Sequence, residues 1–343
     1  MKFSDMPYTR VTPEETGPRM EALTRRIREA TAAEEALDAF YAYETLYDEI
    51  TTRIALAYIH FTGNTEDAFY AAEQDYYDEV MPRFEEQKQA LYRALADSRH
   101  RGALEAALGS LLFTNIELQL KIFKPEILPD LQEENRLVTA YVKLRASAKI
   151  EFDGKILNLS QLEPYEESSD RAVRRASFMA KAGFYKDNGD EFDRLYDELV
   201  KLRTQIARKL GFPSFVELGY CRMGRNCYTQ EDVAAFRANV KAHVVPLAAR
   251  LKEAQAKRIG VDSLTVYDDP LLFPDGNAKP VGTPEEIFAH GKAMYHEMSA
   301  ETAEFIDFML DNELFDVLAR PGKAGGGYCA DLPAHKSTFI FAN

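Results

Sequence analysis

Apolar residues recur at three- and four-residue spacing between residues 15 and 145, and turn signals are few. This spacing places apolar side chains on one face of an α-helix and predicts several long amphipathic helices. One stripe steps by four, three, four and three residues through Ala36, Phe40, Tyr43, Tyr47 and Ile50. We interpret it as core packing and not as a ligand site, because the apolar face of an amphipathic helix normally faces the interior.

Two local signals predict breaks in this helical region. The segment Thr62-Gly63-Asn64-Thr65 predicts a turn, and Thr65 is a candidate N-cap because its hydroxyl oxygen can accept a backbone hydrogen bond. Pro82 predicts a disruption of a helix interior, because proline has no amide hydrogen to donate. We therefore expect the helical pattern to be interrupted at both positions.

Two parts of the chain have the pattern of β-strands. Over residues 149–159, apolar and polar residues alternate on both sides of Asp153-Gly154, a dipeptide that favours a tight hairpin turn. Residues 327–343 predict two strands joined by a turn, and the second strand is apolar and β-prone. A strand of this kind is prone to aggregation when exposed, so we expect the natural chain to continue beyond Asn343 and cover it.

Cap signals predict the helices in the second half of the chain. Asp170 begins one helix, and Gly211 ends the next because glycine readily adopts the left-handed conformation that closes helices. Thr229 and Thr283 each begin a helix, since a threonine followed three residues later by an acidic residue resembles a capping box. Pro246 lies inside the helix that follows Thr229 and predicts its kink or break.

These signals predict a mainly α fold: a large multi-helix body with a small β-hairpin near 149–159 and a short β-sheet segment near 327–343. The 343 residues exceed the roughly 250–300 at which one core usually stops growing, so we expect more than one part. The parts are an N-terminal helical lobe at 1–148, the hairpin with a helical body at 149–320, and the start of a β segment at 321–343.

Charge excludes one class of partner. The chain carries 56 acidic and 42 basic residues, a formal net charge of −14. This balance disfavours nucleic acid, because the phosphate backbone attracts basic surfaces. The basic clusters Arg25-Arg26-Ile27-Arg28 and Arg171-Ala172-Val173-Arg174-Arg175 lie in helical patterns, and we interpret both as solvated helix faces.

The sequence also indicates a compartment. No apolar run approaches the roughly 18 residues that a membrane span needs, and the N-terminus has no apolar signal-peptide core. Three cysteines without a C-x-x-C motif indicate reduced thiols and not a disulfide framework. We therefore expect a cytoplasmic protein that binds neither membrane nor nucleic acid.

No set of residues completes a catalytic or metal site. His296-Glu297 begins an H-E-x-x-H zinc motif, but Ala300 stands where the second histidine belongs. Cys329 and His335 flank a predicted turn, but their spacing does not identify a nucleophile and its base. We expect Cys329 to be a half-buried strand residue. The residues alone therefore predict no metal site in this chain.

A series of short segments follows a fixed order along nearly the whole chain. They are Phe152-Asp153-Gly154-Lys155, Gln161-Leu162, Asp170-Arg171, Arg174-Arg175-Ala176, Leu218-Gly219-Tyr220, Arg222-Met223, Arg225, Tyr228-Thr229, Asp232-Val233, Val245-Pro246-Leu247, Tyr267-Asp268, Arg320, Gly322-Lys323, Gly327-Tyr328-Cys329, Leu332-Pro333, Lys336 and Phe339-Ile340-Phe341-Ala342-Asn343. Together they resemble the oligoendopeptidase F family of zinc metallopeptidases, relatives of thimet oligopeptidase. The order and spacing of the segments make the resemblance specific.

The resemblance implies a longer enzyme. In that family the chain continues after the segment that matches residues 339–343, and an H-E-x-x-H helix and a later glutamate bind zinc. None of these ligands maps onto this chain, so the resemblance implies zinc in the complete enzyme and none bound by this chain alone. It implies an N-terminal portion whose helical shell restricts access to the channel, with short peptide substrates and the C-terminal catalytic half as partners. We expect this chain alone to be inactive.

The resemblance also suggests a role for the glycine-rich strand. Peptidases of this kind bind an extended peptide against a sheet edge, and glycines let two backbones approach closely. We predict that Gly327, Tyr328 and Cys329 offer main-chain hydrogen bonds to substrate. Two alternatives stay open: a purely structural hairpin, or a non-catalytic helical binding or scaffold protein whose C-terminal hairpin docks a partner.

Overall fold

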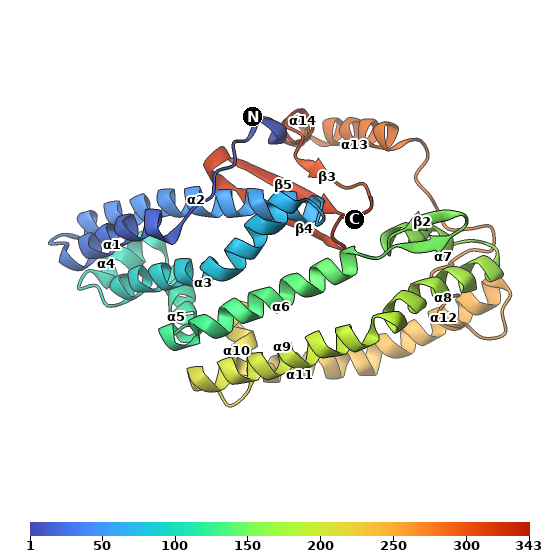
Figure 1. The fold of residues 1–343 in the computed structure, drawn as a ribbon, viewed down its shortest axis with the longest axis horizontal. Helices are drawn as coiled ribbons and strands as arrows, with labels where there is room; N and C mark the ends of the chain where they lie inside the picture. Colours follow the sequence, from blue (N-terminus) through green and yellow to red (C-terminus); the bar gives the residue numbers. More distant parts are fainter.

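The first half of the chain folds into long helices in the computed structural model, which describes residues 1–343 (Figure 1). The elements are η1 (Phe3–Asp5), α1 (Pro13–Glu29), α2 (Ala33–Gly63), α3 (Ala68–Ala96), α4 (Arg101–Leu108), α5 (Ser110–Lys121), η2 (Pro125–Ile127) and α6 (Leu128–Ala146). Helices α1, α2 and α3 pack on one another around the largest core. The α2 stripe lies in this core, with Tyr47 partly buried and the other members fully buried, so the prediction of core packing is confirmed.

The predicted turn at residues 62–65 is confirmed, because α2 ends at Gly63 and α3 begins at Ala68, but the predicted cap and the predicted disruption at Pro82 differ from the structure. The N-cap of α3 is Asp67, whose Oδ1 accepts hydrogen bonds from two amides of the first turn at 2.9 and 3.0 Å. Thr65 does not cap the helix, because its hydroxyl donates to the carbonyl oxygen of Gly322 at 2.8 Å. Pro82 lies buried inside an unbroken α3. The packing of α3 against α1 and α6 outweighs the hydrogen bond that proline removes.

The hairpin and the helices after it form as predicted. They are β1 (Ile150–Phe152), β2 (Lys155–Leu157), η3 (Ser160–Leu162), α7 (Glu163–Glu166), α8 (Arg171–Asp187), α9 (Gly189–Leu210) and α10 (Phe215–Arg222). Asp153 and Gly154 have φ of 53° and 68°, the positive values that a tight two-residue turn requires. Asp170 caps α8 with its side chain, and Gly211 closes α9 in the left-handed conformation.

The next helical segment contains an irregular turn. The elements are α11 (Gln230–Asn239), the π-helical turn η4 (Val240–Val244), α12 (Val245–Ile259), α13 (Pro284–Met298) and α14 (Ala300–Asp311). Thr229 and Thr283 form the predicted capping boxes of α11 and α13. Pro246 lies in the first turn of α12, directly after the π turn, where a missing amide hydrogen costs no regular helical bond. The predicted kink or break thus corresponds to a π-helical turn before Pro246, and the helical segment continues through it without a gap.

Three strands near Asn343 form a sheet in the order β3-β5-β4. They are β3 (Phe315–Asp316), β4 (Gly327–Leu332) and β5 (Ser337–Ala342), with the 3₁₀ turn η5 (Pro333–His335) between the last two. The predicted strands β4 and β5 pair antiparallel, and β3, which no sequence signal predicted, runs parallel to β5. Phe339 and Phe341 of β5 pack with Leu56 and Ile59 of α2 in a second core, which fixes the sheet beside that helix.

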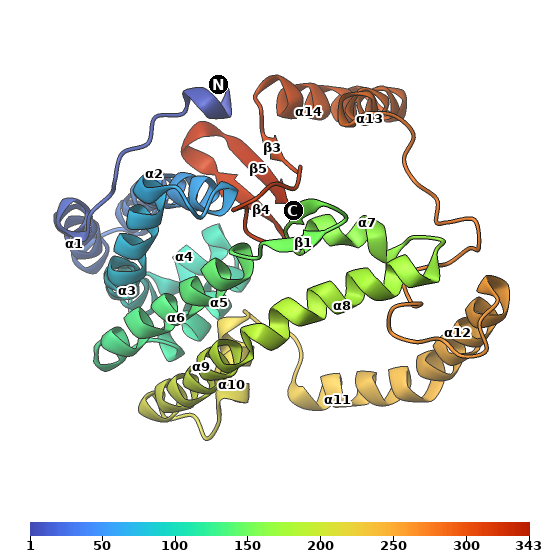
Figure 2. The same ribbon diagram turned by 45° about the vertical axis from the view of Figure 1, so that its right-hand side comes forward.

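The helices surround this sheet unevenly. Helix α9 packs on α6, and α8, α11 and α12 extend from there to the far side of the molecule (Figure 2). The fold is mainly α with a small hairpin and a short sheet, as predicted. Among these helices, none combines the length and the sustained apolar composition of a membrane-crossing segment. The division into parts at 1–148, 149–320 and 321–343 stays a prediction.

Candidate functional site

The outer strand β4 has one edge that pairs with no other strand. Because the sheet order is β3-β5-β4, only β5 borders β4. The amide of Asn343 donates to the carbonyl oxygen of Gly326 at 2.9 Å, and this bond sets the alternation of the antiparallel ladder. Under that alternation, Tyr328 exchanges main-chain hydrogen bonds with β5, whereas Gly327 and Cys329 direct theirs to the open edge.

The other side of β5 follows the same alternation. Ile340, which lies opposite Cys329, donates its amide to the carbonyl oxygen of Leu314 at 2.9 Å. Its main-chain groups therefore point away from β4, as expected for a pair without hydrogen bonds. Asp331, two residues beyond Cys329, has the same outward orientation. Every second residue of β4 thus offers an N–H and a C=O to an additional strand.

The side chain of Tyr328 anchors β4 to α2. Its hydroxyl oxygen lies 2.6 Å from Thr62 Oγ1, and its ring centroid lies 5.4 Å from that of Tyr58. Burial raises the pKa of Tyr328, so the hydroxyl stays protonated at neutral pH. The assignment of substrate contacts to Gly327, Tyr328 and Cys329 stays a prediction. Of these three residues, only Gly327 and Cys329 have main-chain groups that point to the open edge.

Backbone geometry explains the glycine run before β4. Gly326 has a φ of +97°, a left-handed conformation that other residues adopt only with strain. A Cβ added at Gly327 would lie 3.1 Å from the carbonyl oxygen of Phe341, so any side chain there presses on β5. An approaching main chain therefore meets no side chain at the first residue of the edge.

A buried lysine holds this end of the sheet in place. Lys323 Nζ donates to Asp316 Oδ1 at 2.8 Å and to the carbonyl oxygen of Ala342 at the end of β5. Burial alone would raise the pKa of Asp316, but hydrogen bonds from Arg320 and Lys323 outweigh it and lower the pKa below its ordinary value. The start of β4 is thus tied to β5 and β3 by one charged cluster.

Cys329 is exposed, which corrects the expectation of a half-buried residue. Its Sγ lies 2.9 Å from Thr338 Oγ1, and no histidine contacts the thiol. The reason is the position of β4 at the sheet edge. Cys329 lies on the sheet face opposite Tyr328 and α2, and that face is not covered by a helix of the core.

The histidines are not arranged as metal ligands. His296 lies on the exposed surface of α13, and its Nε2 is 2.8 Å from Asp307 Oδ1 of α14. No three His, Cys, Asp or Glu side chains converge in a geometry that could hold a metal ion. The partial motif at His296-Glu297 therefore has a local structural partner.

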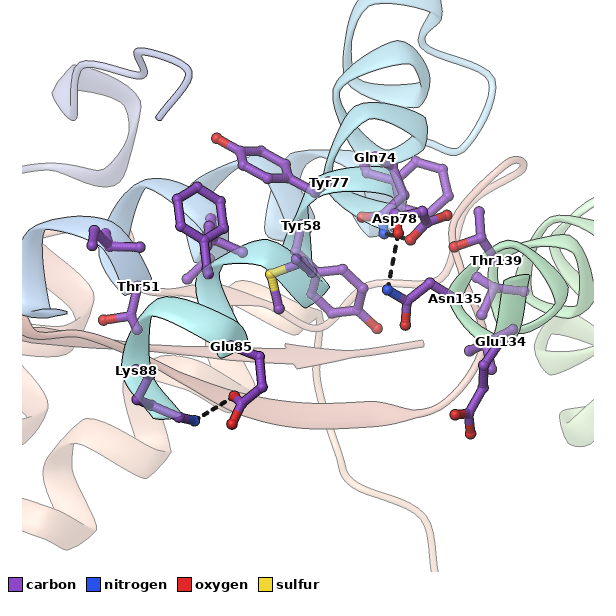
Figure 3. Close-up of a pocket in the computed structure, with 18 of the residues that line it drawn as sticks. Thr51, Tyr58, Gln74, Tyr77, Asp78, Glu85, Lys88, Glu134, Asn135 and Thr139 are labelled. Atoms are coloured by element: carbon purple, nitrogen blue, oxygen red, sulfur yellow. Dashed lines mark hydrogen bonds and ion pairs between the residues drawn. The ribbon is translucent and has the colours of Figure 1, made fainter. Parts of the chain in front are cut away.

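A pocket of about 490 Å³ opens between α2, α3 and α6 (Figure 3). Glu85 and Lys88 form an ion pair at 2.6 Å at one end, and Asp78 lies at the other end. Tyr47 and Ile50, the last two members of the α2 stripe, line this pocket in addition to packing against the core. No pattern in the sequence predicts the pocket, because its walls combine α2 and α3 with α6, which follows more than 30 residues after α3.

An ion cluster that sequence reasoning missed fixes α8 to the loop after α12. The fully buried Asp268 accepts hydrogen bonds from Arg171 at 3.0 and 2.8 Å and from Arg174 at 2.9 Å. These bonds, led by Arg171, hold the pKa of Asp268 well below its ordinary range despite burial. The interpretation of residues 171–175 as a solvated face is therefore wrong for Arg174, whose partner lies 94 residues away in sequence. In the cluster at 25–28, the arginines are exposed as expected.

Two family descriptions match this chain. Residues 3–123 match the peptidase M3 N-terminal domain, and residues 165–272 match peptidase family M3. A comparison with curated proteins gives no match.

Solved peptidase structures superpose on the whole chain. A putative oligoendopeptidase F is 45% identical with a TM-score of 0.99, and the match covers 100% of this chain and 61% of that one. A structure described as PZ peptidase A with inhibitor 2 is 44% identical with a TM-score of 0.99 and the same coverage. A putative oligoendopeptidase F from Bacillus anthracis str. Ames is 43% identical with a TM-score of 0.98, covering 100% of this chain and 63% of its own. This chain therefore spans less than two thirds of the length of these relatives.

Proposed function

Because this chain belongs to the peptidase M3 family, we propose that it is the substrate-enclosing part of a zinc-dependent oligoendopeptidase that hydrolyses short peptides. The 45% identity over 100% of the chain, at a TM-score of 0.99, is the observation that most supports this proposal. The helical shell restricts access, so that only short, unfolded peptides reach the catalytic centre of the complete enzyme. The cytoplasm is the proposed compartment, because the chain's three cysteines are free thiols.

A zinc ion does not fit the residues of this chain. No three ligating side chains converge, and His296 is paired with Asp307. We assign the zinc ligands and the general base to the part of the complete enzyme that lies outside residues 1–343.

The contribution of this chain is to hold the peptide. The outward N–H and C=O groups of Gly327 and Cys329 pair with an extended peptide as one more strand beside β4. Main-chain pairing supplies affinity that does not depend on the peptide sequence. This mode suits an enzyme that accepts many short peptides.

A second surface supports a role within a larger enzyme. Five large apolar side chains on α11, η4 and α12 are exposed: Phe236, Val244, Val245, Leu247 and Leu251. Exposed apolar groups gathered on one helical segment are a common mark of an interaction surface. We propose that the catalytic part of the enzyme covers them.

The first test uses the chain by itself. Residues 1–343 are expected to bind no stoichiometric zinc, by elemental analysis, and to leave a quenched fluorescent peptide uncleaved. Addition of the catalytic part as a separate polypeptide is expected to restore zinc-dependent cleavage. Zinc-dependent turnover by the chain alone would prove the assignment of the ligands wrong.

The second test probes the strand edge in the complete enzyme. Gly327→Pro removes an outward N–H that takes no part in the β4–β5 ladder, so the fold should persist while KM rises by about fivefold or more. Gly327→Ala is the matched control, because it crowds Phe341 in the same way but keeps the N–H. Equal KM values for the two variants would remove Gly327 from the peptide site.

A non-catalytic helical binding or scaffold protein is the second candidate. The open edge of β4 favours it equally well, because any extended segment of a partner can pair there. The restoration experiment separates the candidates. A scaffold protein would gain no zinc-dependent cleavage when the catalytic part is added.

A further inference from the structure

The pocket between α2, α3 and α6 has an apolar mouth. Three large apolar side chains, one from each helix, remain exposed around it: Tyr58 by 39%, Met81 by 41% and Val138 by 38%. Deeper in the pocket, Phe61 and Tyr77 are buried. A volume of about 490 Å³ with mostly apolar walls is in the size range of a small-ligand site.

One oxygen atom of a carboxyl group in the wall lacks a hydrogen-bond donor. Asp78 is 4% exposed, and its Oδ1 accepts a hydrogen bond from Gln74 Nε2 at 2.8 Å. Thr139 lies near this carboxyl, yet no hydrogen bond reaches Oδ2, which is fully buried. A buried carboxylate oxygen without a donor is costly, so the site favours a ligand that brings one.

The other acidic residues of the pocket already have basic partners. Glu85 is paired with Lys88 at 2.6 Å, and Glu134 accepts from Arg203 at 2.7 Å and from Arg222 at 2.9 Å. Asp78 therefore differs from them in having no cation of its own. Burial raises its pKa, and Gln74 and Thr139 oppose the rise without cancelling it.

The pocket adjoins the strand that holds the peptide in the proposed function. The Tyr58 ring of its mouth lies 5.4 Å from the Tyr328 ring of β4. Helix α6 lines the pocket and ends close to the start of β4. A Cβ added at Gly325, just before β4, would lie 3.3 Å from Nη2 of Arg145 at the end of α6. Figure 3 shows strands of the sheet passing beside the pocket.

We propose that this pocket binds one side chain of the peptide substrate, a side chain that is apolar along its length and ends in an N–H donor. Tryptophan, arginine and lysine have this form. The apolar walls cover the stem, and the donor meets Asp78 Oδ2 once the carboxyl group turns towards the pocket. Leucine would leave that oxygen unpaired, and glutamate would place two carboxylates together. This inference rests on the proposed peptidase function and names the substrate side chain it selects.

The chain contains no tryptophan, which gives a direct binding assay. The probe is acetyl-Gly-Trp-Gly-amide added to residues 1–343, with selective excitation of its indole. Binding is expected to shift the emission to shorter wavelength in a saturable manner. Acetyl-Gly-Arg-Gly-amide should displace the probe, and the leucine and glutamate counterparts should displace it much less. A wild-type chain that causes no shift would overturn the proposal.

Two variants locate the binding. Asp78→Asn keeps the contact to Gln74 but places an amide NH₂ at the Oδ2 position, so the probe should bind about tenfold more weakly. Asp75→Asn is the matched control, since Asp75 is an exposed residue of the same helix, paired with Lys143 outside the pocket. Val138→Phe fills the exposed mouth and should abolish binding even if Asp78→Asn fails to fold.

Unchanged binding by Val138→Phe, or by a folded Asp78→Asn, would overturn the proposal. Concentration-dependent dimers of the wild-type chain that Val138→Phe abolishes would also overturn it, because a second copy would then be the occupant. The assay needs no catalysis. If the restoration experiment fails while the probe binds normally, the peptidase assignment is rejected. The class of ligand proposed for the pocket is then still supported.

Discussion

Helices α1 to α3 and helices α11 to α13 all carry apolar side chains, but their apolar faces have different surroundings. In the first group the faces meet one another around the largest core. In the second group, α11, η4 and α13 contain no buried residue, and side chains such as Phe236 and Leu251 lie exposed. An apolar pattern therefore predicts that a helix forms, whereas the surface that covers it depends on the rest of the molecule.

Two phenylalanines give the largest expected contrast between these regions. Phe113 of α5 is fully buried in the core that α1 to α3 surround, and Phe113→Ala should lower the free energy of unfolding by about 3–5 kcal/mol. Phe236 of α11 is 66% exposed, and Phe236→Ala should change it by less than about 0.5 kcal/mol. Urea titration followed by circular dichroism measures both values. Equal losses would mean that α11 belongs to a core as well.

Asp268 gives the next largest effect, because it ties α8 to the loop after α12. Asp268→Asn should lower the free energy of unfolding by about 1–3 kcal/mol. The pKa of Asp268 is lower in the folded chain than the unfolded value of about 3.9. Its stabilising contribution is therefore complete above that pH and is lost as the pH falls towards the folded pKa.

Acid titration of the unfolding free energy checks this linkage. The wild-type chain should lose stability below about pH 4 more steeply than Asp268→Asn. Asp269→Asn is the control, because Asp269 is an exposed neighbour whose pair with Lys252 contributes little. Parallel acid profiles for wild type and Asp268→Asn would contradict the role of the ion cluster.

The helix caps give the smallest contrast. Asp67→Ala removes the N-cap of the packed helix α3 and should cost about 1 kcal/mol of global stability. Thr229→Ala removes the N-cap of α11, which has no buried residue, so fraying there should leave global unfolding unchanged. Hydrogen exchange should nevertheless become faster in α11. A global loss of similar size for both variants would show that α11 unfolds together with the core.

Local signals predicted local structure well. The Asp153-Gly154 turn and the Thr229 capping box are confirmed, because every atom that they require lies within a few residues. The errors involve partners that are far away in sequence. Pro82 stays in a helix because α3 is packed on both sides, and Arg174 is buried because Asp268 reaches it from another loop.

In the candidate site, too, the features that depend on distant parts of the chain could not be predicted from local signals. The resemblance to a peptidase family predicted substrate contacts at Gly327, Tyr328 and Cys329. The register of β4 against β5 was needed to show that the main-chain groups of Gly327 and Cys329 point outward and those of Tyr328 do not. Asp78 had no signal at all, because a carboxylate on a helix becomes a candidate ligand group only when neighbouring helices bury it and leave one oxygen without a donor.

In the proposed peptidase, the open edge of β4 has a consequence for product lengths. Its outward groups recur at every second residue, from Gly327 through Cys329 to Asp331. A peptide held by main-chain bonds alone meets an equivalent set of partners after it slides by two residues, but not after it slides by one. Under the proposed function, the alternative cleavage products of one short peptide should therefore differ mainly by even numbers of residues, and a mass spectrum of the digest would display that spacing.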